Sequence, residues 1–97
     1  MRGFVFLAKA ADEFLRATEH YEQERAGLGD DFQSEVQTVI SRLMDYPESG
    51  AVVLRDARRA RVKRFPYDLV YKTRGETLII VSVMHQRRRP GIWKDRI

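Results

Sequence analysis

The sequence contains no cysteine and no apolar stretch of membrane-spanning length, and each absence narrows what the chain can be. Without cysteine, neither disulfide bonds nor thiolate metal ligands can hold the fold together. The aliphatic run from Leu78 to Val81 is far too short to cross a bilayer. Residues 1–20 include acidic side chains and lack the basic, apolar and small-residue order of a signal peptide. We therefore expect a cytoplasmic protein without a membrane partner.

Motifs for common catalytic and cofactor chemistry are also missing. The sequence has no serine nucleophile motif, no phosphate loop and no dinucleotide fingerprint. His20 lies among glutamates, and no second histidine or cysteine stands at metal-ligand spacing from it. We expect neither a metal nor a cofactor. A chain of 97 residues has room for one folded domain, residues 1–97.

What the sequence does contain is an uneven distribution of charge. Residues 1–50 hold 5 Lys and Arg against 10 Asp and Glu, a net charge of −5. Residues 51–97 hold 13 Lys and Arg against 4 Asp and Glu, a net charge of +9. A basic surface favours an anionic partner such as nucleic acid or an acidic protein, although surface charge also serves solubility alone. We expect the two signs to mark different sides of the domain.

The first half of the chain has the pattern of a short strand followed by two helices. Residues 3–7 are aromatic and aliphatic, as in a strand. Apolar residues then recur at helical spacing over residues 10–21 and again over residues 32–43. A Gly-Leu-Gly break separates the two patterns. We therefore expect a helical hairpin whose second helix is capped by Gly29 or Asp30.

The second half has the alternation of strands. Residues 58–65 alternate between apolar and basic side chains. In the next segment Tyr67, Leu69 and Tyr71 share one face, opposite Asp68, Val70 and Lys72. Residues 73–76 have the composition of a turn, and residues 77–84 are apolar on both faces, which is typical of a central strand covered on both sides. The order predicts an α+β fold: a short N-terminal strand and a two-helix hairpin packed on an antiparallel sheet of three to four strands.

A basic strand is the first candidate binding feature. Arg59, Arg61 and Lys63 occupy alternate positions, so a strand would place them on one face about 6.6 Å apart. That spacing is similar to the step between phosphates of an extended nucleic-acid strand. No carboxylate interrupts the run, so nothing within it neutralises the three cations. The solvated outer face of a half-buried strand has the same pattern.

The segment after the central strand is the second candidate. His85 has the chemistry of a general acid or base near neutral pH, although a structural role is the simpler explanation for an isolated histidine. Arg87, Arg88 and Arg89 follow, and arginine binds phosphate through paired N–H groups. Trp93 either stacks on a nucleic-acid base or closes the core, and the large area of an indole favours the core.

A combination of short motifs points to a known family. Phe14, the Gly-Leu-Gly break with Phe32, and Val83-Met84-His85 occur in a fixed order along the chain. The signature residues of the strands and the C-terminal segment are Phe65, Pro66, Tyr67, Tyr71, Pro90 and Trp93. Together they resemble the RelE/ParE superfamily, most closely its ParE-like branch, over nearly the whole chain. The resemblance implies the same α+β fold and the toxin half of a type II toxin–antitoxin (plasmid stabilisation-like) system, neutralised by a cognate antitoxin.

The RelE-like branch of this superfamily cleaves messenger RNA on the ribosome without a metal. For that activity the resemblance indicates Lys63, His85, Arg87 and Arg88 as candidate catalytic residues. Where RelE-like enzymes carry a tyrosine near the C-terminus, this chain has Ile92 or Trp93, and neither side chain transfers a proton in that role.

The ParE-like branch is associated with poisoning of DNA gyrase and has no catalytic site of its own. The resemblance therefore implies a toxin that binds an antitoxin and inhibits gyrase without catalysis. A RelE-type endoribonuclease acting on ribosome-bound mRNA is the alternative, and a non-toxic nucleic-acid-binding module is a further one. The residues expected to contact the target are Arg59, Arg61, Lys63, Arg64, Arg88 and Arg89.

Overall fold

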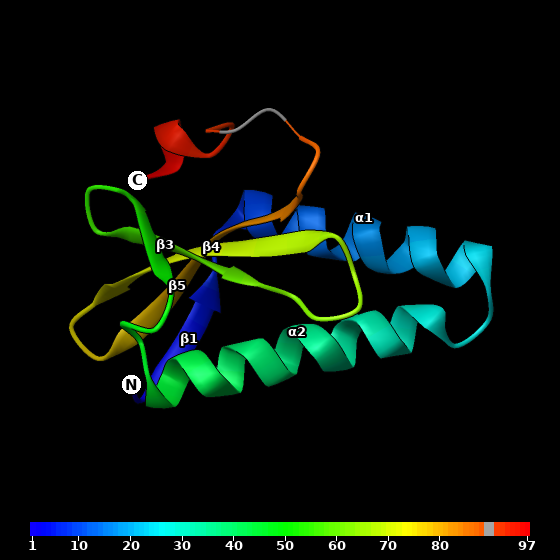
Figure 1. The fold of residues 1–97 in the computed structure, drawn as a ribbon, viewed down its shortest axis with the longest axis horizontal. Helices are drawn as coiled ribbons and strands as arrows, with labels where there is room; N and C mark the ends of the chain where they lie inside the picture. Colours follow the sequence, from blue (N-terminus) through cyan, green and yellow to red (C-terminus); the bar gives the residue numbers. More distant parts are fainter. Residues whose placement is uncertain (89–90) are drawn as a thin grey trace.

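The computed structural model describes residues 1–88 and 91–97. A short strand, β1 (Gly3–Phe6), leads into two helices, α1 (Ala8–Glu24) and α2 (Leu28–Asp45). The strands β2 (Ala51–Leu54), β3 (Ala57–Arg61), β4 (Tyr67–Arg74) and β5 (Thr77–His85) follow, and a 3-10 helix, η1 (Lys94–Arg96), lies near the C-terminus. The described chain therefore has the predicted order of strand, helical hairpin and strands (Figure 1).

The five strands form one sheet in the order β1-β5-β4-β3-β2. The strands from β5 to β2 pair antiparallel, whereas β1 pairs in parallel with β5, with Gly3 opposite Thr77. The predicted α+β fold with a helical hairpin is confirmed, and four antiparallel strands agree with the expected three to four. The N-terminal strand joins the same sheet as a fifth strand at its edge, which makes the sheet mixed.

A glutamate of α1 caps the start of α2. Gly27 has a left-handed φ of 90°, a conformation that glycine adopts without strain. The carboxylate of Glu22 accepts hydrogen bonds from the backbone N–H groups of Gly27 and Gly29, at 3.1 Å each. The predicted cap at Gly29 or Asp30 is wrong, because α2 begins before either residue. A Cβ on Gly29 would lie 2.9 Å from the carbonyl oxygen of Thr18, so this glycine permits close packing of the two helices.

The main core lies between the helical hairpin and one face of the sheet. Its centre includes Phe32 from α2 and Tyr71 from β4, both completely buried. The Tyr71 hydroxyl donates to the carbonyl oxygen of Pro47 at 2.7 Å and accepts from the N–H of Gly50 at 2.9 Å. A side chain on Gly50 would collide with Tyr71, since its Cβ would lie 2.5 Å from the hydroxyl oxygen. Tyr71 therefore fixes the loop between α2 and β2.

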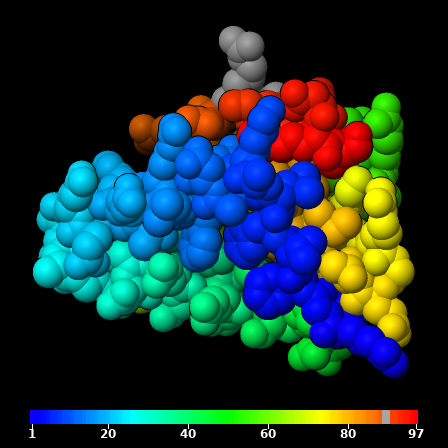
Figure 2. Space-filling view, turned by 180° about the vertical axis from the view of Figure 1, so that it is seen from behind, coloured from blue at the N-terminus to red at the C-terminus, as the bar shows by residue number. Residues whose placement is uncertain are grey.

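The opposite face of the sheet is covered by the C-terminal segment. Trp93 is only 5% exposed and packs in a second apolar cluster with Val70, Val81 and Met84. Seen from behind, this segment lies beside the beginning of α1 (Figure 2). The predictions that Trp93 closes a core and that β5 is covered on both faces are confirmed.

β3 is shorter than the predicted strand. It ends at Arg61, and residues 63 and 64 form a turn in which Arg64 has a positive φ of 70°. The alternation that predicted a strand as far as Phe65 continues in the sequence, but the backbone leaves the sheet. Within the described residues, no helix is long and apolar enough to cross a membrane.

Candidate functional site

The outer face of β3 carries two of the three predicted cations. Arg59 and Arg61 are exposed, and Lys63 is exposed in the turn after the strand, so the three do not form one row on a strand. Asp68 of β4 pairs opposite Arg61, and its carboxylate lies 3.7 Å from Nε of Arg59. The run itself contains no carboxylate, but the neighbouring strand supplies one that partly neutralises it.

A hollow of about 250 Å³ separates this basic face from the C-terminal segment. Asp68 is only 7% exposed, and Gln86 donates to its carboxylate at 3.2 Å. Trp93 and Met84 contribute apolar surface to the lining, and Arg59 and Arg88 contribute charge. The outer face thus combines cations with a buried carboxylate and apolar surface, a mixture suited to protein contacts.

Arg64 points back toward the helices. Its guanidinium lies 3.5 Å from Asp31 and 3.4 Å from Glu35, both on α2, and 5.7 Å from the ring centre of Phe65. The predicted separation of the two charge signs is interrupted at this point, because basic and acidic residues pair across the hairpin and the strands. As a candidate for target binding, Arg64 is already engaged within the domain.

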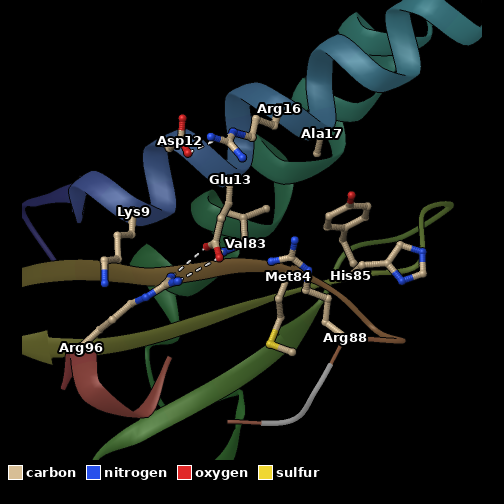
Figure 3. Close-up of a pocket in the computed structure, with 11 residues that line it drawn as sticks. Lys9, Asp12, Glu13, Arg16, Ala17, Val83, Met84, His85, Arg88 and Arg96 are labelled. Carbon is tan, nitrogen blue, oxygen red and sulfur yellow. Dashed lines mark hydrogen bonds and ion pairs between the residues drawn. The ribbon is translucent and has the colours of Figure 1, made fainter. Parts of the chain in front are cut away.

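A cleft of about 310 Å³ lies between α1 and the end of β5, and we call it the α1–β5 cleft (Figure 3). Residues from both helical and strand elements form its walls. They are Lys9, Asp12, Glu13, Arg16 and Ala17 of α1, Tyr67 of β4, Val83, Met84 and His85 of β5, and Arg88 and Arg96. Of the charged and titratable residues that line this cleft, the sequence indicated a functional role only for His85 and Arg88. Tyr67 was predicted to be a structural residue.

One end of the α1–β5 cleft is closed by a buried ion pair. The guanidinium of Arg96 donates to Glu13 at 2.9 and 3.1 Å, and to the carbonyl oxygen of Val81 at 3.1 Å. Glu13 also accepts from the Ser82 hydroxyl at 2.9 Å and from the Val83 N–H at 3.1 Å. The side chains of Arg96 and Glu13 are 10% and 14% exposed. This clasp joins α1, β5 and the C-terminal segment.

The other end of the cleft brings together Tyr67, His85 and Arg88. The rings of Tyr67 and His85 meet edge to face with centres 5.2 Å apart. Burial raises the pKa of Tyr67, the positive charge of Arg88 opposes that shift, and the negative charge of Glu13 adds to it. Tyr67 therefore remains a protonated hydroxyl at neutral pH. His85 accepts the N–H of Arg87 at Nδ1, at 3.0 Å, so the neutral ring carries its proton on Nε2.

Only two of the four candidate catalytic residues lie in the same cleft. His85 and Arg88 line the α1–β5 cleft, whereas Lys63 lines neither this cleft nor the outer-face hollow, and Arg87 is exposed. Arg89 and Pro90 lie outside the described residues. Among the residues that the structure describes, no group of three His, Asp or Glu side chains is placed to hold a metal ion.

Sequence reasoning missed Lys9, Glu13 and Arg96 as parts of a site. Glu13 was indistinguishable from the other acidic residues of a helix, and Arg96 lies 83 residues from it. No local pattern links positions so far apart, so only the folded arrangement brings them together.

The fold and its cleft define a small α+β protein whose charged surfaces suit binding to other macromolecules. A family model described as the ParE toxin of the type II toxin–antitoxin system parDE matches residues 4–90. The chain therefore belongs to the family of ParE toxins of type II toxin–antitoxin systems.

Known structures support the fold assignment. A chain of the chromosomal ParDE toxin–antitoxin system from P. aeruginosa superposes with a TM-score of 0.62 and 16% sequence identity, covering 88% of this chain and 96% of that one. At this identity the similarity establishes the fold. No curated protein matches the sequence.

Proposed function

We propose that the protein is held inactive by a cognate antitoxin and, when free, inhibits DNA gyrase by binding rather than by catalysis. The observation that carries the proposal is the match to the ParE toxin family over residues 4–90. The gyrase target follows from the ParE-like resemblance of the sequence, and the cytoplasm is the compartment in which gyrase is found.

The arrangement of the candidate residues supports binding over RNA cleavage. Ile92 or Trp93 stands where RelE-like enzymes carry a tyrosine; Trp93 is buried in an apolar cluster, and neither side chain transfers a proton. Lys63 and His85 do not share a cavity. Metal-independent cleavage of RNA needs a proton-transfer group and cations converging on one phosphate. The ribonuclease alternative therefore has less support.

Induced expression with and without the neighbouring antitoxin gene tests the toxin role. We expect growth arrest when the chain is expressed alone and normal growth when both genes are expressed. Purified protein added to gyrase and supercoiled DNA should then stabilise broken DNA, while ribosome-bound mRNA stays intact. If the mRNA were cleaved and the DNA stayed intact, the ribonuclease function would replace gyrase inhibition. Loss of cleavage in a His85→Ala variant would then show that His85 is the proton-transfer group. Unaffected growth would leave the non-toxic nucleic-acid-binding module as the better description.

The outer basic face is the proposed target surface. For an Arg59→Gln/Arg61→Gln double variant, we expect the expression level needed to arrest growth to rise at least tenfold. Both guanidinium groups are exposed on β3 and therefore accessible to a target. The matched control is Arg42→Gln/Arg74→Gln, which removes the same charge from exposed residues on α2 and the end of β4. Equal loss in both double variants would mean that net charge, not this face, determines toxicity.

The edge strand β1 is the proposed docking site for an extended antitoxin segment. β1 is the outermost strand next to β5, and its Phe4 and Val5 are 47% and 49% exposed. An unpaired strand edge with exposed apolar side chains accepts a further strand through backbone hydrogen bonds. Val5→Lys should weaken antitoxin binding at least tenfold, measured by calorimetry. Val52→Lys, on the opposite edge strand β2, is the control, and an equal effect of both changes would argue against β1.

A further inference from the structure

The charges that line the α1–β5 cleft do not balance. Asp12 is paired with Arg16 at 3.1 Å, and Glu13 is paired with Arg96 at 2.9 Å. Both carboxylates are therefore occupied by cations of the cleft itself. Lys9 and Arg88 have no ion-pair partner among the described residues, so two positive charges remain available.

The donors at the strand end of the cleft converge without an acceptor. Figure 3 shows Arg88 reaching from the segment after β5 toward α1, beside His85. Tyr67 and Arg88 line the same cleft, and the Tyr67 ring lies against His85. Within the described residues, neither side chain donates a hydrogen bond to a protein acceptor. A guanidinium beside a neutral hydroxyl is a pair of donors that suits an oxyanion.

The shape of the cleft limits the size of a ligand. Its volume of about 310 Å³ is at the lower end for small-molecule sites. The aromatic rings of Tyr67 and His85 line the same end of the cleft as the Arg88 guanidinium. Val83 and Met84 add apolar surface. A compact ligand with one charged group and one flat apolar part fits these walls better than a polymer does.

We propose that the α1–β5 cleft binds a phosphate monoester, with the phosphate at Arg88 and the Tyr67 hydroxyl and with Lys9 adding attraction from the far end of the cleft. A monoester dianion matches the two unpaired positive charges, and its three terminal oxygens accept from both the guanidinium fork and the hydroxyl. The ester part lies against the Tyr67 and His85 rings. Arg88 also lines the outer-face hollow, so this site shares one residue with the proposed target surface, whereas Tyr67 and Lys9 line the α1–β5 cleft and not that hollow. The proposal does not depend on the gyrase or antitoxin contacts.

Titration followed by amide chemical shifts of the purified protein tests the proposal. The probes are adenosine 5′-monophosphate, inorganic phosphate and adenosine, each up to 10 mM at pH 7 and at low and high salt. We expect adenosine 5′-monophosphate to shift amides of α1 and the end of β5 in a saturable, salt-sensitive way, and adenosine to leave them unchanged. Inorganic phosphate binding at the same amides supports the oxyanion site and identifies free phosphate as a sufficient ligand.

Matched variants distinguish specific phosphate binding in the cleft from non-specific attraction of an anion to a basic protein. Arg88→Gln should weaken binding about tenfold and Tyr67→Phe about fivefold, the effect of losing one charged or one neutral hydrogen bond. Arg74→Gln removes one exposed charge at the far end of β4 and should leave affinity unchanged. The proposal is overturned by an absence of shifts at 10 mM, by adenosine binding as well as its monophosphate, or by equal losses in Arg88→Gln and Arg74→Gln. Selective binding of an acidic peptide instead of the monophosphate also overturns it.

Discussion

The buried pair of Glu13 and Arg96 provides the sharpest test of how this domain is held together. We consider Glu13→Gln, which keeps the size of the side chain and removes its charge. In the native protein Glu13 accepts four hydrogen bonds, two from Arg96, one from Ser82 and one from the backbone of Val83. The glutamine amide group turns a donor toward either Arg96 or the strand, so at least one of these contacts is lost.

The expected cost follows from the burial of both partners. The Arg96 side chain is 10% exposed, so its charge is left without a counter-charge in a poorly solvated position. Removing one member of a buried pair costs about 3–5 kcal/mol, and a charged hydrogen bond alone about 1.5–3 kcal/mol. Because the amide keeps some contacts, we expect Glu13→Gln to lower the free energy of unfolding by about 2–3 kcal/mol. For a domain of this size that loss lowers Tm by roughly 10–20 °C.

Urea denaturation at pH 7 measures this free energy, with Asp12→Asn as the control. Asp12 pairs with Arg16 on the surface of the same helix, with side chains 56% and 78% exposed, so its loss should cost less than about 1 kcal/mol. Adding Arg96→Met to Glu13→Gln should recover part of the loss, because the unpaired charge is removed. A Glu13→Gln variant within about 0.5 kcal/mol of the native protein, or strictly additive single changes, would refute the reasoning.

Three further predictions concern single side chains. Tyr71→Phe should lower the free energy of unfolding by about 1–3 kcal/mol in urea, since it leaves buried polar groups of the loop before β2 unpaired, whereas the exposed Tyr46→Phe should change it little. Gly29→Ala should lower Tm by several degrees, because its Cβ meets α1, while Gly3→Ala, which meets nothing within 4 Å, should not. Burial raises the pKa of Tyr67 above 10.0, so the folded state keeps this proton longer than the unfolded state does, and stability falls as the pH rises past 10. Tyr67→Phe should therefore show a smaller loss of urea midpoint between pH 8 and pH 11, and an unchanged loss would contradict the shift.

The elements that were predictable are those defined by local periodicity. The helical stripe that includes Phe32 and Leu43 faces the core, and the apolar run of β5 is covered on both sides, as each pattern indicates. The turn at Lys63 was not predictable, because the sequence continues to alternate and Arg64 adopts a positive φ that is usually marked by glycine. Side-chain identity alone did not reveal this departure from the sheet.

The candidate site was less predictable than the fold for a different reason. The composition of the sequence reveals its basic residues, but the side chains that pair with them come from other helices and strands. Asp68 neutralises part of the β3 row from the neighbouring strand, and Glu13 meets Arg96 across most of the chain. Pairings of this range depend on sheet register and helix position, which no short pattern encodes.

The parallel pairing of β1 with β5 sets a time order for folding during synthesis. Gly3 can find its partner only after the ribosome has added Thr77, and at about 5–20 residues per second roughly 4–15 s separate the two. During that interval the hairpin emerges with the apolar face of α2 uncovered, since the strands that bury it are not yet made. The clasp between Glu13 and Arg96 closes later still. The edge of the sheet at β1 and the α1–β5 cleft are therefore completed only near the end of the synthesis of the domain.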